Sequence, residues 1–326
     1  MSTAGTGLVC LLGADPATYR PHPVHAAADR TYRETNCYAD VLIELLHARG
    51  DEPLAALGAT VRLDFEGDQW TFFKPAPGDL EQLYGLDVHE MQPYRALPDQ
   101  IAEQLAAGRT IIVELDAFHL PDTAATSYGA EHVKTSVIAE AIDRDAQMLR
   151  YFHNAGLYEL GGEDYRGIFR LEGEIDPALL PPYTELVRFD AGPRLEGEAL
   201  RCAARDLLRH HLARRPQTNP FERFGDALAR DLPDLLAGDA ANYHAYAFAT
   251  VRMVGSGFEL LAAQATWLLG ESEAPEIVAA MDEIVDGTKL LSLKLARRRP
   301  FDPAPVIAGL AGAWERATGG LDAALA

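Results

Sequence analysis

The pattern of apolar residues changes near residue 190, and this change most limits how the chain can fold. Before that point, runs rich in β-branched and aromatic residues predict strands at residues 60–65, 70–73, 110–115, 132–142 and 147–153. Strands that follow one another without crossover helices predict an antiparallel sheet. After that point, a helical period predicts helices at residues 195–214, 221–236, 240–269, 274–298 and 304–318. We therefore expect an α+β domain at residues 1–190 and an all-α domain at residues 191–326.

Turn and breaker residues place the shorter connections. Glu66-Gly67-Asp68 lies between two of the predicted strands and indicates a hairpin. Gly108 closes an amphipathic helix at residues 97–107, and the apolar run at residues 8–12 predicts a further strand. Prolines are frequent at residues 176–193, which we interpret as a linker between the two domains.

Charge and cysteine content restrict the partners and the compartment. The chain has 29 basic and 49 acidic residues and a net charge of −20, which disfavours nucleic acid and an anionic membrane surface as partners. No apolar stretch approaches the roughly 20 residues of a membrane helix, and the N-terminus lacks the basic region of a signal peptide. Cys10, Cys37 and Cys202 are too widely spaced for a metal-binding motif. We expect a soluble protein of the reducing cytoplasm.

The segment ETNCYADVLIELLHARG, residues 34–50, places Cys37 where a helix is predicted to begin, after the N-cap types Thr35 and Asn36. Apolar residues follow with the spacing of one buried helical face, at Val41, Leu42, Leu45 and Leu46. A thiol at a helix N-terminus lies beside unpaired N–H groups and the positive end of the helix dipole, which both favour the reactive thiolate. The alternative is that Cys37 is a small buried hydrophobe, as most free cysteines are.

A cysteine nucleophile needs a base, and the base needs a group that orients it. His132 opens the predicted strand HVKTSVIAEAID, and Asn154 ends the next strand, QMLRYFHN. The turn between them centres near residue 144, so His132 and Asn154 should come close to opposite each other in an antiparallel hairpin. The order Cys, His, Asn along the chain is that of papain-like enzymes. We therefore expect a Cys37–His132–Asn154 triad on a papain-like domain.

Other interpretations of these residues stay open. His132 is also typical of a surface histidine at a strand end, and Asn154 precedes an Ala-Gly pair, which indicates a turn. Asn36 and Gln69 are candidate amide donors to an oxyanion, together with the backbone N–H of Cys37.

The segment LDAFHLPD contains three residues of metal-ligating type with helix-like spacing. These residues, Asp116, His119 and Asp122, follow a predicted strand and are interrupted by Pro121. Since that context does not fit a helical ligand set, we expect neither a metal nor a bound cofactor.

Four segments, ETNCYADVLIELLH, LDFEGDQWTFFKP, VELDAFHLPDT and EHVKTSVIAEAID…YFHNAG, resemble a bacterial domain family labelled as of unknown function, over most of the first 190 residues. More distantly, G-R-x-I-I-V-x-x-D-x-F-x-L-P followed by H-V, I-D and F-H-N is similar to the N-terminal domain of the butirosin-biosynthesis side-chain acyltransferases. In that resemblance, Cys37 matches the nucleophile, His132 the histidine after the LP loop, and Asn154 the polar residue that ends the next strand. The chain departs from it at Asn36, where a histidine often stands, and in the polar residues that follow His132.

The resemblance implies a cysteine acyltransferase of specialised metabolism. Such an enzyme takes an aminoacyl group from the phosphopantetheine thioester of an acyl carrier protein and passes it to a small amine, through an acyl-enzyme on Cys37. Two alternatives remain: a papain-like hydrolase (thioesterase, amidase or peptidase), and a non-catalytic module that binds a carrier protein. Apolar residues at 240–269 are compatible with core packing or with a homodimer interface.

Overall fold

The computed structural model describes residues 7–33, 36–171 and 180–326. The chain divides into two compact units. The first contains residues 1–26, 37–53 and 77–195, and the second contains residues 27–36, 54–76 and 196–326. Residues 27–36 and 54–76 therefore belong to the same unit as the C-terminal helices. The predicted division near residue 190 places both segments in the first domain.

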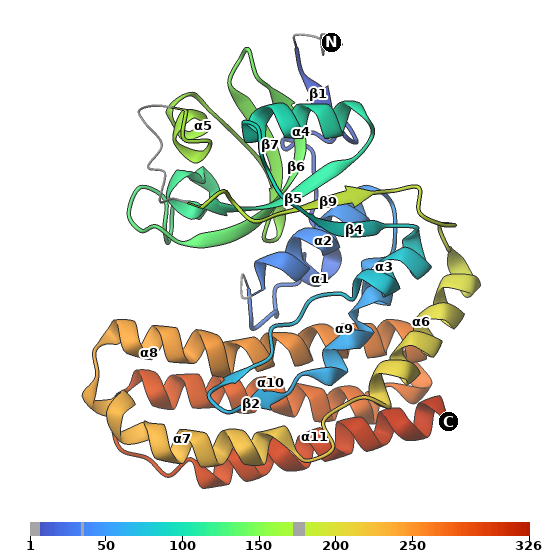
Figure 1. The fold of residues 1–326 in the computed structure, drawn as a ribbon. Helices are drawn as coiled ribbons and strands as arrows, with labels where there is room; N and C mark the ends of the chain where they lie inside the picture. Colours follow the sequence, from blue (N-terminus) through green and yellow to red (C-terminus); the bar gives the residue numbers. More distant parts are fainter. Residues whose placement is uncertain (1–6, 34–35, 172–179) are drawn as a thin grey trace. The chain divides into compact units, whose positions relative to one another are not determined.

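The first unit is built on an antiparallel sheet with the strand order β4-β9-β5-β6-β7-β8, and β1 also pairs with β6 (Figure 1). The strands are β1 (Val9–Cys10), β4 (Asp87–Met91), β5 (Thr110–Asp116), β6 (Lys134–Asp143), β7 (Met148–His153), β8 (Gly156–Gly161) and β9 (Thr184–Arg188). The α+β class and the antiparallel sheet predicted from the sequence are confirmed. The ends of β5, β6 and β7 are shifted by one or two residues from the prediction, and β4 and β8 were not predicted.

Strand β9 corrects the interpretation of residues 176–193 as a linker. Its residues pair with β4 on one side and with β5 on the other, so β9 is an internal strand. The prolines of this stretch that the structure describes, Pro181, Pro182 and Pro193, lie outside the strand, where a missing N–H does not interrupt a ladder. The prolines predict a linker, whereas pairing with β4 and β5, which are distant in sequence, stabilises a strand there.

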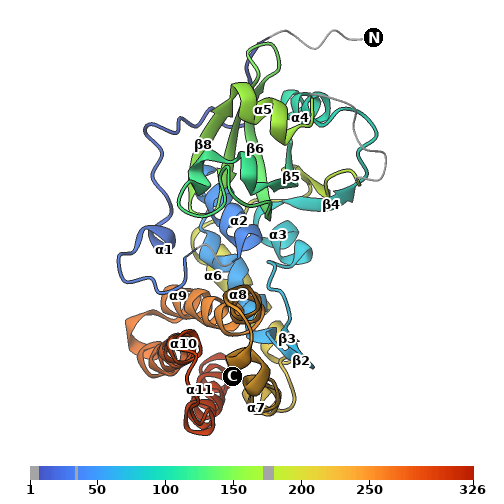
Figure 2. The same cartoon turned by 90° about the vertical axis from the view of Figure 1, so that its left-hand side faces the viewer.

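Helices cover both faces of this sheet (Figures 1 and 2). They are α1 (Pro23–Ala26), α2 (Cys37–Ala48), α3 (Pro77–Tyr84), α4 (Leu97–Ala106) and α5 (Gly162–Ile168). Side chains of β5 alternate, so Ile111, Val113 and Leu115 enter a buried apolar cluster with residues of α4 and α5. Helix α2 lies on the opposite face, against β6 and β7. Two 3-10 turns, Ala117–His119 and Pro121–Thr123, follow β5.

The second unit is a bundle of helices at the predicted places, except that a π-helical turn divides the single helix predicted at residues 240–269 into two. The helices are α6 (Gly197–Leu212), α7 (Pro220–Ala237), α8 (Ala240–Ala247), α9 (Met253–Glu273), α10 (Pro275–Ala296) and α11 (Ala304–Leu325), with the π-helical turn at Phe248–Arg252. Pro233 lies inside α7 instead of ending it, and Gly270 kinks α9 with φ +74°. Within the described residues, no helix is long and apolar enough to cross a membrane.

The predicted hairpin around Gly67 belongs to this second unit and is shorter than expected. It consists of β2 (Phe65–Glu66) and β3 (Gln69–Trp70), while residues 60–62 belong to a 3-10 helix, Pro53–Arg62. The ring of Trp70 lies 4.9 Å from that of Phe221, and the ring of Phe65 lies 5.4 Å from that of Phe224. These buried aromatic contacts attach the hairpin to α7. They stabilise it because an isolated two-stranded hairpin is only marginally stable.

Candidate active site

Cys37 is the first residue of α2, as predicted, and its side chain is partly exposed. The helix forms there because residues 38–46 are all buried, so packing against the sheet holds its first turn in place. The sulfur accepts a hydrogen bond from the backbone N–H of Ser136 in β6, with an N–S distance of 3.4 Å. Cys37 is therefore only partly buried, and its sulfur lies against β6 of the sheet.

Two tyrosines and one carboxylate connect the first turn of α2 to β9. The hydroxyl groups of Tyr38 and Tyr183 both donate to Glu185, on its two carboxylate oxygens, with a distance of 2.7 Å for Tyr183. Burial, followed by the hydrogen bond to Glu185, raises the pKa of both phenols. Both tyrosines therefore remain neutral donors at physiological pH, and the residue beside Cys37 is fastened to the sheet.

His132 lies two residues before β6 and forms a pair with Asp116 at the end of β5. Its Nδ1 atom is 2.6 Å from Oδ2 of Asp116, and its ring stacks on Phe118 with the centroids 4.5 Å apart. Partial burial acts to raise the pKa of the Asp116 carboxyl, but hydrogen bonds from His132 and from the Phe118 N–H outweigh it and hold the pKa below its ordinary value. An ionised Asp116 fixes the histidine with Nδ1 as the donor, which leaves Nε2 to exchange protons.

The predicted register between His132 and Asn154 is wrong. The last pair of the β6–β7 ladder is Val137 with His153, and the register shifts between Ala139 and Ala141. Asn154 therefore comes level with Ser136 instead of His132. It occupies the tight turn between β7 and β8 with φ 45°, a left-handed conformation that asparagine adopts more readily than most residues. The geometry of Asn154 therefore supports its interpretation as a turn residue. The group that orients His132 is Asp116.

The positions of Cys37 and His132 can be compared along β6. Ser136, the contact of Cys37, is the ladder partner of Glu114, and Glu114 forms a 2.7 Å ion pair with Lys134. His132 is four residues before Ser136, which corresponds to about 13 Å of extended chain. The Glu114–Lys134 pair thus lies between the cysteine and the Asp116–His132 pair along the two strands.

A pocket of about 420 Å³ opens beside these two pairs. Its polar lining consists of Glu114, Asp116, His119, His132, Lys134 and Arg170, and the stretch from Leu180 to Tyr183 closes one side. Glu114, the ladder partner of Ser136, and Lys134, two residues before Ser136 in β6, both line the pocket, whereas Cys37 and Ser136 are not among its lining residues. The nucleophile candidate, the histidine–carboxylate pair and the pocket therefore belong to one region of the first unit.

The remaining predicted residues have other surroundings. The side-chain amide of Asn36 donates to the carbonyl of Phe73, at 2.8 Å, and Gln69 is exposed on the β2–β3 hairpin of the second unit. Thr35, a predicted capping residue, lies outside the described residues. Asp122 accepts hydrogen bonds from Tyr151 and His153, at 2.6 and 2.5 Å, and so attaches the turns after β5 to β7. Among the described residues, no group of three or more His, Cys, Asp or Glu could hold a metal ion.

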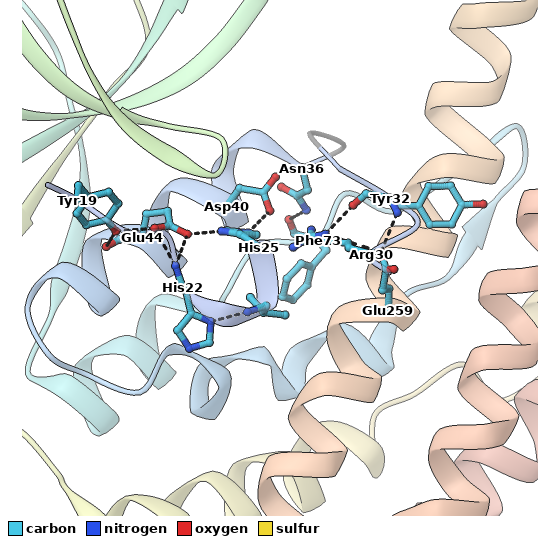
Figure 3. A network of polar contacts seen from close by, with 11 residues as sticks. Tyr19, His22, His25, Arg30, Tyr32, Asn36, Asp40, Glu44, Phe73 and Glu259 are labelled. Carbon is cyan, nitrogen blue, oxygen red and sulfur yellow. Dashed lines mark hydrogen bonds and ion pairs between the residues drawn. The ribbon is translucent and has the colours of Figure 1, made fainter. Parts of the chain in front are cut away.

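A buried polar network on α2 was not predicted from the sequence (Figure 3). Glu44 is completely buried and accepts hydrogen bonds from the hydroxyl of Tyr19, the backbone N–H of His22 and a ring nitrogen of His25. The other ring nitrogen of His25 lies 3.0 Å from Asp40. The network attaches α1 and the preceding loop to the helix that carries Cys37. Two acids four residues apart within the apolar stretch of α2 were the available signal.

Two family models match successive parts of the chain. Residues 20–189 match the DUF1839 N-terminal domain, and residues 197–323 match the DUF1839 C-terminal domain. A search of curated proteins finds no match. Because the two domains follow each other in order over most of the chain, the protein belongs to the DUF1839 family.

Proposed function

We propose that the first unit is a cysteine acyltransferase that moves an aminoacyl group from a carrier-protein thioester to an amine through an acyl-enzyme on Cys37. The observation that carries this proposal is the hydrogen bond between His132 and Asp116 at the edge of the pocket, because it provides an oriented base beside space for a second substrate. The donor class is taken from the resemblance to the butirosin-biosynthesis acyltransferases. A papain-like evolutionary origin of the domain is part of the same proposal.

In the first half-reaction, the Cys37 sulfur attacks the thioester carbonyl of the donor. A new carbon–sulfur bond forms to Cys37, the bond to the phosphopantetheine sulfur breaks, and the thiol proton is transferred to that leaving sulfur. The N–H groups of the first turn of α2 face the developing oxyanion from the helix N-terminus. One thioester replaces another, so this step needs no nucleotide.

In the second half-reaction, an amine held in the pocket attacks the acyl-enzyme. Nε2 of His132 takes the proton that the amine loses, while Asp116 stabilises the imidazolium that forms. The carbon–sulfur bond breaks and the amide is released. The Cys37 thiolate then takes a proton from water, and His132 gives its proton back to water. The place of His132 along β6 supports this role, at the acceptor, better than direct contact with the thiol.

One observation favours hydrolysis as a second candidate function. The side chain of His132 is 72% exposed, so water has access to the same base. A thioesterase, amidase or peptidase would use the same residues with water as the acceptor. The fate of the acyl-enzyme distinguishes the two, since an added amine captures the acyl group in a transferase and does not in a hydrolase.

The experiment that tests this function is intact-protein mass spectrometry. The protein is incubated with an aminoacyl N-acetylcysteamine thioester as the donor probe, with Cys37→Ala and Cys202→Ala run in parallel. We expect a covalent aminoacyl adduct on the wild type and on Cys202→Ala, and none on Cys37→Ala. An adduct of equal yield on Cys37→Ala, or the absence of any adduct on the wild type, would refute the proposal and support a non-catalytic carrier-protein module.

A further inference from the structure

The charged side chains are balanced in number among the described residues that line the 420 Å³ pocket. The pocket is lined by two carboxylates, Glu114 and Asp116, and by two permanent cations, Lys134 and Arg170; two histidines and Tyr183 add further polar groups. A pocket with this composition favours neither a simple anion nor a simple cation, because either would leave one sign of charge uncompensated. A ligand that carries both charges matches it.

Not all of these charged groups have a partner of opposite charge, and this difference determines how a zwitterionic ligand would be oriented in the pocket. Lys134 is paired with Glu114 at 2.7 Å, and Asp116 with His132 at 2.6 Å. Arg170 has no carboxylate partner within residues 7–33, 36–171 and 180–326, and its Nη1 atom donates to the carbonyl of Leu180 at 3.2 Å. A guanidinium that has no carboxylate partner among the described residues and lies beside a cavity is a site for a ligand carboxylate, which it binds with two parallel N–H donors.

The backbone holds Arg170 in this position. The residue follows α5 with φ 54°, and its N–H is bonded to the carbonyl of Gly167, so the chain turns sharply at the end of the helix. Gly167 lines the pocket beside His119, and a Cβ at this position would overlap the histidine ring. The close approach of His119 to α5 therefore requires glycine at residue 167 and keeps the ring at the pocket wall.

We infer that this pocket binds a free amino acid or a closely similar zwitterion, with its carboxylate on Arg170 and its ammonium group toward Glu114 and Asp116. In an acyltransferase this ligand is the acceptor, and its amine lies beside His132, the base that takes its proton. That role rests on the proposed function, whereas the binding itself does not.

Binding is tested on full-length Cys37→Ala protein, in which no transfer can occur. Each of the twenty common α-amino acids is titrated by isothermal calorimetry and compared with its own carboxamide, which keeps the amine and lacks the carboxylate. We expect at least one amino acid to bind, and its carboxamide to bind at least tenfold more weakly.

Two arginine variants test whether Arg170 causes the preference for the amino acid over its carboxamide. Arg170→Gln is expected to reduce amino-acid affinity at least tenfold and to make the acid and the amide bind alike. Arg166→Gln is the matched control, four residues earlier in α5, because its guanidinium contacts Gln147 and does not line the pocket. This variant should preserve the difference. Equal binding of acid and amide by the Cys37→Ala protein, no binding of any amino acid at millimolar concentration, or an unchanged preference in Arg170→Gln would each overturn the inference. Amino-acid binding without any acyl adduct on the wild type would keep this inference and refute the acyltransferase.

Discussion

The Nδ1 atom of His132 lies 2.6 Å from Oδ2 of Asp116, across the end of the β5–β6 ladder. Asp116 ends β5 and His132 lies two residues before the neighbouring strand β6, whereas Asn154 comes from the turn between β7 and β8. The orienting carboxylate of the candidate site is thus supplied by the strand before His132, not by the strand after it.

Replacing the orienting carboxylate should impair catalysis without impairing the fold. Asp116→Asn keeps the shape of the side chain but lets His132 adopt the wrong tautomer, so we expect kcat to fall by about 10²–10⁴-fold, the usual range for general-base catalysis. Steady-state transfer to an amine acceptor provides the measurement. Asn154→Gly serves as the comparison, since glycine retains the left-handed turn, and it should keep near-normal kcat. The reverse order of the two variants would return the orienting role to Asn154.

Glu44→Gln should strongly destabilise the first unit. Glu44 is fully buried and accepts hydrogen bonds from Tyr19, His22 and His25, so its removal leaves the His25 pair without one carboxylate. Breaking a buried pair of this kind costs about 3 kcal/mol of unfolding free energy. Glu103→Gln breaks the exposed pair with Arg95 and should cost less than about 1 kcal/mol. Urea unfolding midpoints compare the two, and equal losses would show that the α2 network contributes no more than a surface ion pair.

His22 predicts a dependence of stability on acid pH. Burial, followed by repulsion from His47, lowers the pKa of His22 from 6.5 to about 4, although Glu44 opposes the shift. The neutral ring also accepts a hydrogen bond from the N–H of Val24, at 3.2 Å. The unfolded chain therefore binds this proton between pH 6.5 and 4 while the folded chain does not, so stability falls as the pH is lowered through this window.

The expected loss is about 3 kcal/mol, since each pKa unit corresponds to about 1.4 kcal/mol. His22→Asn keeps an acceptor for Val24 and removes the titration. The difference in unfolding free energy between wild type and His22→Asn, measured by urea denaturation from pH 7 to pH 4, should shift in favour of the variant. Parallel curves for the two proteins would contradict the assigned pKa, because every other group titrates in both.

Two glycines of the second unit should respond oppositely to alanine. A Cβ at Gly255 would overlap the ring of Tyr32 and the hydroxyl of Thr288, which are joined by a 2.9 Å hydrogen bond in the core. Gly255→Ala should therefore destabilise the protein by about 1–3 kcal/mol, as overpacking does. Gly309, inside α11, has open space around its Cβ position, and Gly309→Ala should add about 0.5–1 kcal/mol through helix propensity. Thermal unfolding separates the two, and a stabilising Gly255→Ala would mean that the Tyr32 contact can yield at no cost.

Local patterns in the sequence determined much of the architecture. The start of α2 at Cys37, the β6–β7 hairpin and the C-terminal helices were all predictable, because apolar period and capping chemistry act over a few residues. The same patterns placed Cys37 and His132 among the residues worth testing.

Tertiary structure decided the rest. The register of β6 against β7 follows from the position of their turn, where Asp143 pairs with Met148, and from a bulge near residue 140. No short-range signal specifies this register, which places Asn154 level with Ser136 instead of His132. Strand β9 forms because β4 and β5 hold it on both sides, and residues 27–36 and 54–76 join the helical unit through contacts far along the chain. Such long-range pairing brings Asp116 to His132 and Arg170 to the pocket, since the free energy that stabilises it comes from partners that adjacent residues do not encode.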